Sequence, residues 1–199
     1  MMLSCYDVAK YFIYLTYTNR HKRIDGDYSI THLKLQKLLY YAQSFYLALY
    51  DKPLFPERIR AWKLGPVIAE LWHEYKKYGW ENIPSNGEVN LSIDAGTTTV
   101  FLEAIYDSIG HFSAFQLSTM THQEGPWKST QSNCEIMQQA MKLYYKNKID
   151  DFGLRKLALV DQHRDDNTPQ PGRKRRSAFD IYLKSKEKWS GVYRRLANS

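Results

Sequence analysis

Apolar residues recur at three- and four-residue steps along most of the chain, which is the spacing of one face of an α-helix. The strongest signal runs from Thr31, a residue suited to capping a helix, to Tyr50. Its apolar positions are Leu35, Leu38, Leu39, Ala42, Phe45, Tyr46 and Leu49. Similar spacing predicts further helices over residues 4–19, 66–79, 98–109, 113–122 and 132–148. The expected fold class is therefore mainly α, a compact domain of about six to seven helices.

Polar residues with the spacing of a capping box mark where several of these helices begin. The pairs are Ser4 with Asp7, Ser113 with Gln116, Ser132 with Glu135, and Ser177 with Asp180. Pro66, directly after Gly65, suits the first turn of the third helix. The alternation in Val89, Leu91 and Ile93 fits one short extended segment near residues 89–93.

The character of the sequence changes after about residue 150. We expect a helical domain over 1–150, a short helix and basic flexible linker over 151–177, and a C-terminal amphipathic basic helix over 178–199. A basic run in the linker consists of Arg173, Lys174, Arg175 and Arg176. The apolar stripe of the last helix includes Phe179, Tyr182, Leu183, Trp189 and Tyr193.

Composition and charge narrow the class of protein. With 199 residues and 43% hydrophobic residues, the chain is long enough to form a core without disulfides. It has no apolar run of the ~20 residues that span a bilayer. Its first residues lack the order of a secretion signal, so we expect a cytoplasmic protein without membrane association. The formal net charge is +7, and most of it falls between Asp161 and Ser199, which leaves the main body nearly neutral.

No pattern of catalytic or metal-binding chemistry stands out in the sequence. His73-Glu74 is not followed by a second histidine, because position 77 is lysine, so the zinc-protease helix motif is missing. We therefore expect no cofactor, no metal and no enzymatic activity. A hydrolase or transferase would require His122 to lie in a deep polar pocket beside a carboxylate.

Two short motifs have more than one interpretation. The Gly65-Pro66 step either sets the entry angle of a helix, with Trp62 packed beneath it, or offers an anion site at the helix N-terminus. The stretch THQEGPW, residues 121–127, is either a binding lip or a buried corner filled by Trp127. For both motifs the structural interpretation is favoured.

Four segments in register resemble one known family. They are KLQKLLYYAQ (34–43), LYDKPLF (49–55), AWKLGPVIAELWHEYKKYG (61–79) and LSTMTHQEGPW (117–127), and together the match covers roughly residues 4–148. The family is the Panacea domain, also described as the SocA-like or GepA-like phage-associated domain. Its marker residues, most of them interpreted as fold-defining, are here Lys34, Leu35, Gln36, Lys37, Trp62, Gly65, Pro66, Thr121, His122, Pro126 and Trp127.

The resemblance implies a bacterial or phage-encoded antitoxin of a type II toxin–antitoxin pair. It would neutralise a cognate toxin, encoded by an adjacent gene, through direct protein–protein binding, or act as an adaptor that delivers the toxin to a protease. Residues 178–199 are candidates for toxin contact, as an amphipathic helix that docks in a groove of a partner or back on its own domain. The alternative is a mobile-element regulator that binds nucleic acid, or an acidic partner, through the basic run 173–176.

Overall fold

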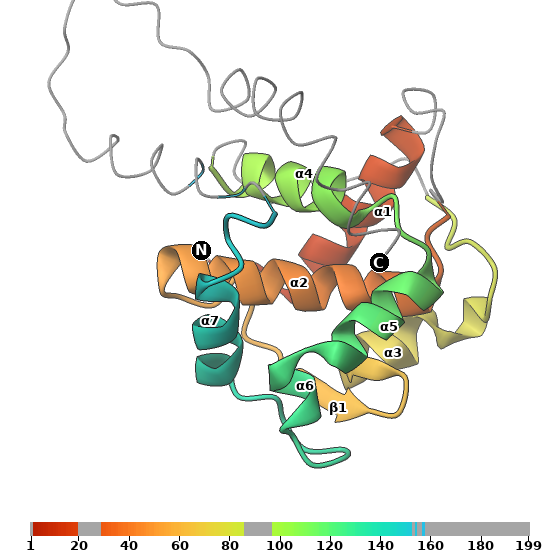
Figure 1. The fold of residues 1–199 in the computed structure, drawn as a ribbon. Helices are drawn as coiled ribbons and strands as arrows, with labels where there is room; N and C mark the ends of the chain where they lie inside the picture. Colours follow the sequence, from red (N-terminus) through yellow and green to blue (C-terminus); the bar gives the residue numbers. More distant parts are fainter. Residues whose placement is uncertain (1, 20–28, 86–96, 153, 155–156, 158–199) are drawn as a thin grey trace, which may run out of the picture.

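Helix α2 (His32–Tyr50) runs through the middle of the molecule, and the other elements pack around it (Figure 1). The computed structural model describes residues 2–19, 29–85, 97–152, 154 and 157. In this part of the chain the remaining elements are α1 (Cys5–Asn19), β1 (Arg60–Trp62), β2 (Gly65–Val67), α3 (Ala69–Tyr75), the 3-10 helix η1 (Lys76–Tyr78), α4 (Thr97–Ile109), α5 (Ala114–Gln123), α6 (Gly125–Lys128) and α7 (Gln138–Lys146). The fold is mainly α, as the periodicity predicted.

The bounds of α2 agree with its sequence signals. The Thr31 side chain accepts a hydrogen bond from the Lys34 backbone N–H at 3.3 Å, which caps the first turn. At the other end, Asp51 adopts a left-handed conformation and its N–H bonds the Leu47 carbonyl. Because neighbours surround α2 on several sides, 15 of its 19 residues are buried, polar side chains included.

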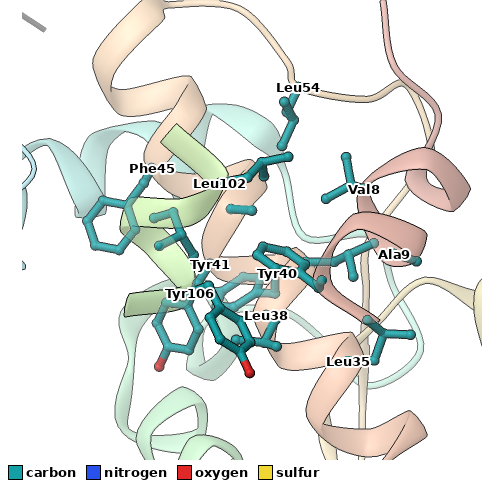
Figure 2. Packing of buried hydrophobic residues seen from close by; sticks show 14 of the residues in the cluster. Val8, Ala9, Leu35, Leu38, Tyr40, Tyr41, Phe45, Leu54, Leu102 and Tyr106 are labelled. Atoms are coloured by element: carbon teal, nitrogen blue, oxygen red, sulfur yellow. The ribbon is translucent and has the colours of Figure 1, made fainter. Parts of the chain in front are cut away.

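The hydrophobic core lies mainly between α1, α2 and α4. Figure 2 shows Val8 and Ala9 of α1, Leu35 and Leu38 of α2, and Leu102 of α4 as members of one cluster. All five side chains are fully buried. Their burial removes apolar surface from three separate helices at once, and this holds the first half of the chain together.

The predicted capping boxes of α1 and α5 are confirmed. The Ser4 backbone N–H donates to the Asp7 carboxylate at 2.9 Å, and Asp7 N–H donates back to the Ser4 hydroxyl at 3.2 Å. The Ser113 side chain and Gln116 make the reciprocal pair at the start of α5. Each pair satisfies backbone N–H groups that have no partner within the helix.

The prediction that Pro66 begins a helix is wrong. Residues 60–67 form a two-stranded antiparallel hairpin in which Trp62 pairs with Gly65. Gly65 has a φ of +98°, which residues other than glycine rarely adopt and which turns the chain back on itself. The helix therefore begins only at Ala69, and η1 ends where Gly79 adopts a φ of +54°.

The prediction that a helix begins at Ser132 is also wrong. The chain turns at residues 132–133, where Asn133 has a φ of +64°, and Glu135 then forms a bridge with Arg60 of β1. Asn133 N–H bonds the Ala61 carbonyl at 2.7 Å, and Ile136 N–H bonds the Ile59 carbonyl at 2.8 Å. These long-range bonds prevent a helical turn over this stretch, so α7 begins at Gln138. The buried face of α7 carries Met141 and Tyr145, while Leu143 is exposed.

Several predicted features lie outside the described residues. These are the extended segment at 89–93 and the C-terminal candidates, the basic run 173–176 and the apolar stripe of residues 178–199. Among the residues that are described, no helix is both long enough and apolar enough to cross a lipid bilayer.

Candidate functional site

Two glutamines of α2 bond the backbone of segments that are distant in sequence. The Gln36 side chain accepts from the Ile68 N–H at 2.8 Å and donates to the Ile68 carbonyl at 3.3 Å. Gln43 in the same way donates to the Phe55 carbonyl and accepts from the Phe55 and Leu54 N–H groups. A buried amide that bonds both the N–H and the carbonyl of one residue fixes the backbone at that residue. The glutamines thus hold the chain before and after the hairpin against α2.

Lys37 lies one turn before Tyr41 on α2 and is completely buried. Its ammonium donates to the Pro66 carbonyl at 3.0 Å, and burial lowers the pKa of Lys37 to about 7. The neighbouring Gly65 has no room for a side chain. A Cβ atom there would lie 2.6 Å from Lys37 Nζ and 2.8 Å from Thr121 Oγ1. Lysine, glycine and threonine therefore form one tight contact between α2, the hairpin and α5.

Aromatic residues pack on the opposite side of the hairpin from Lys37. The Trp127 indole donates to the Trp62 carbonyl at 3.1 Å, and the Trp62 indole donates to the Asn133 side chain at 3.1 Å. The rings of His122 and Trp127 lie 4.2 Å apart. The THQEGPW stretch thus forms a corner, the junction of α5 with the short helix α6, packed on the hairpin.

The structure brings most of the predicted marker residues into this one region, the hairpin clamp, which we define as Gln36, Lys37, Trp62, Gly65, Pro66, Thr121, His122 and Trp127. Leu35 lies elsewhere, in the core against α1 (Figure 2). Lys34 and Pro126 are both buried. Because the clamp is largely internal, its polar groups position backbone segments of the domain itself.

No carboxylate of the described residues is among the groups that act on the pKa of the His122 imidazole. Burial lowers the pKa of His122, the Lys37 ammonium lowers it further, and a hydrogen bond with the Lys63 backbone acts in the opposite direction. Within the described ranges, no group of three or more His, Cys, Asp or Glu side chains is placed to hold a metal ion.

Sequence reasoning missed a buried carboxylate between α5 and α6. Glu124 accepts a hydrogen bond from the Tyr41 hydroxyl at 2.9 Å and another from the Tyr145 hydroxyl. Burial raises the pKa of Glu124 to about 7. The sequence held one signal, since Glu124 lies inside the THQEGPW motif.

Glu124 lies at the edge of an apolar cavity of about 480 Å³. Its walls come from the end of α4, from α5, from α7 and from the segment that follows α7. We call it the Glu124 groove, and its principal apolar residues are Phe112, Phe115, Met120, Tyr144 and Phe152. Phe115 is 79% exposed, so an aromatic ring at this groove faces solvent.

The structure describes a mainly α domain with a buried polar clamp and an open apolar groove. These features are typical of a class of protein modules that bind other molecules. Residues 35–128 match the family model described as "Antitoxin SocA-like, Panacea domain". This segment, a little under half of the chain, is similar to the family that the resemblance indicated.

A curated relative supports the same assignment. The chain is 30% identical over 113 residues to Antitoxin SocA from Caulobacter vibrioides (strain NA1000 / CB15N). The alignment covers 51% of this chain and 60% of that antitoxin, so the chain spans less than two thirds of the relative that it matches. No solved structure matches the chain.

Proposed function

We propose that this protein is the antitoxin of a toxin–antitoxin pair, and that it neutralises its toxin by direct protein–protein binding without chemistry of its own. The observation that carries the proposal is the match of residues 35–128 to the SocA-like antitoxin domain. The matched range contains every residue of the hairpin clamp, from Gln36 to Trp127. The similarity to this family supports an antitoxin role, with a toxin as the partner in general.

The geometry supports binding by a surface that exists before the partner arrives. Lys37 and Gln36 fix the hairpin to α2, and Trp127 fixes it to α6. A rigid surface loses little conformational entropy when a partner binds, so less of the interaction energy is spent on ordering. Because the polar groups of the clamp bond segments of the domain itself, we propose that side chains outside the clamp make the toxin contact.

Co-expression with the neighbouring gene tests this proposal. We expect the neighbour alone to stop bacterial growth, and growth to recover when this protein is also produced. The two purified proteins should then form a complex in size-exclusion chromatography. A neighbour that is harmless alone, or that stays lethal in the presence of the full-length chain, would contradict the proposal.

The same cells separate sequestration from delivery to a protease. We expect the amount of toxin, followed by immunoblot after protein synthesis is blocked, to stay constant when the antitoxin is present. A toxin that disappears faster with the antitoxin than without it would show that the antitoxin acts as a proteolysis adaptor.

A further inference from the structure

We propose that the Glu124 groove is the toxin-binding surface, and that it receives a segment of the toxin in which an arginine or lysine side chain adjoins an aromatic or aliphatic one. This inference rests on the proposed function, because the occupant is the toxin. It adds the place of contact and the chemistry of the segment that is recognised.

The walls of the groove provide the apolar half of the recognition. Phe115 projects from α5 with 79% of its surface exposed, although it borders a cavity that is otherwise lined by partly or fully buried rings. Neighbouring walls come from Phe112, Met120, Tyr144 and Phe152. An apolar side chain of a partner would remove these surfaces from water, which favours association. A volume of about 480 Å³ holds one or two large side chains.

Charged groups at the groove provide the electrostatic half of the recognition. Two carboxylates, Glu124 and Asp151, and one ammonium, that of Lys148, are among its lining groups. Lys148 forms an ion pair with Asp151 at 3.2 Å, so the cation is shared with a rim carboxylate. The groove therefore has one more acidic than basic group, and Lys148, whose charge also acts on Glu124, is bonded to Asp151 instead. Burying a carboxylate without a directly bonded cation is unfavourable, and a basic side chain that enters the groove would offset this.

The bonding of Glu124 leaves capacity for such a cation. Each carboxylate oxygen accepts one hydroxyl, from Tyr41 and from Tyr145. An ionised carboxylate has about four lone-pair positions, so further N–H donors of a guanidinium or ammonium find acceptors there. The tyrosines come from α2 and α7, and both helices hold the carboxylate in place before the partner binds.

This arrangement makes toxin binding dependent on pH. Burial raises the pKa of Glu124 to about 7, so part of the free protein carries a neutral acid near neutral pH. A bound cation favours the ionised form and lowers that pKa, so binding releases a proton and weakens as the pH falls below 7. The titratable groups that act on Glu124 are Tyr40 and Tyr41 of α2, Tyr144 and Tyr145 of α7, and Lys148 after α7, and Asp151 lines the same groove.

Binding of the full-length chain to its purified toxin, measured by isothermal titration calorimetry, tests the proposal. We expect Glu124→Gln, which keeps the shape but removes the charge, to raise the Kd at pH 8 at least tenfold. Phe115→Ala should raise it by a similar factor. The matched controls are Glu103→Gln, which alters another carboxylate bonded by a tyrosine, and Trp80→Ala, which alters another exposed aromatic residue. Both controls should bind like the original chain.

The pH series gives an independent readout. Between pH 8 and pH 6 we expect the Kd of the original chain to rise up to about tenfold for the one proton released, and that of Glu124→Gln to stay level by comparison. Unchanged affinity in both groove variants, or a pH dependence that survives in Glu124→Gln, would overturn the assignment of the groove. If Glu124→Gln does not fold, Phe115→Ala decides, because an exposed ring has little part in folding.

Neutralisation by the original chain distinguishes the two proposals. If the original chain and both groove variants suppress the toxin equally well, the antitoxin function stands and the assignment of the groove as the binding surface is refuted. A chain that neither binds nor suppresses the toxin refutes both.

Discussion

Replacing Gly65 with alanine tests whether the hairpin clamp is as tight as the structure indicates. Gly65 has a φ of +98°, and an added Cβ would meet Lys37 Nζ at 2.6 Å and Thr121 Oγ1 at 2.8 Å. Neither neighbour moves away easily, because Lys37 is fully buried and bonded to the Pro66 carbonyl, and Thr121 is fully buried on α5. Gly65→Ala should therefore be destabilising for two separate reasons.

The two contributions have different sizes and are separable. A residue held in a disfavoured backbone conformation costs about 1–3 kcal/mol. Overpacking a filled interior costs a further ~1–3 kcal/mol. Gly79 is the matched control, because its φ is also positive, at +54°, while nothing lies within 4 Å of an added Cβ. We expect Gly79→Ala to show the first cost alone and Gly65→Ala to show both, about 4 kcal/mol in total.

Urea unfolding followed by circular dichroism measures this difference. A loss of about 4 kcal/mol is a large part of the ~5–15 kcal/mol that stabilises an ordinary domain. Gly65→Ala should therefore unfold at a much lower urea concentration than Gly79→Ala, with a similar slope. If the two variants lose the same free energy within ~0.5 kcal/mol, the contact around Gly65 is not tight, and the reasoning is refuted.

Three further predictions concern the clamp and the C-terminal segment. Gln36→Leu should lower the free energy of unfolding by about 2 kcal/mol or more in urea, because it leaves the Ile68 N–H and carbonyl unpaired in the interior; a loss under ~0.5 kcal/mol would contradict this. Burial lowers the pKa of Lys37 to about 7, so above pH 7 the unfolded chain binds one proton more than the folded chain. The free energy of unfolding should therefore rise by about 1.4 kcal/mol per pH unit between pH 7 and 9. Lys37→Met should remove this slope. Trp189→Ala should weaken toxin binding by about 2 kcal/mol if the last segment anchors the toxin, and an unchanged Kd would reject that contact.

The sequence alone determined the features of this protein that depend on near neighbours in the chain. The spacing of apolar residues located α2, and Thr31 marked its first turn. The Ser113–Gln116 pair located the start of α5. Helix periodicity and capping arise from contacts three or four residues apart, so a single stretch of sequence contains both partners.

Only the tertiary structure decided which segments lie side by side. The Gly65-Pro66 step suits a helix start locally, but Lys37, 29 residues earlier, bonds the Pro66 carbonyl, and Trp62 pairs with Gly65. The Ser132–Glu135 pattern failed for the same reason, because the hydrogen bonds of residues 133–136 to β1 replace those of a helical turn.

The candidate site shows the same division. The THQEGPW motif drew attention to the right corner of the molecule, yet it did not reveal that Glu124 meets Tyr41 and Tyr145 there. Those residues come from helices 83 and 21 residues away along the chain. The burial of a polar group depends on what the whole fold places around it, and no local pattern encodes that arrangement.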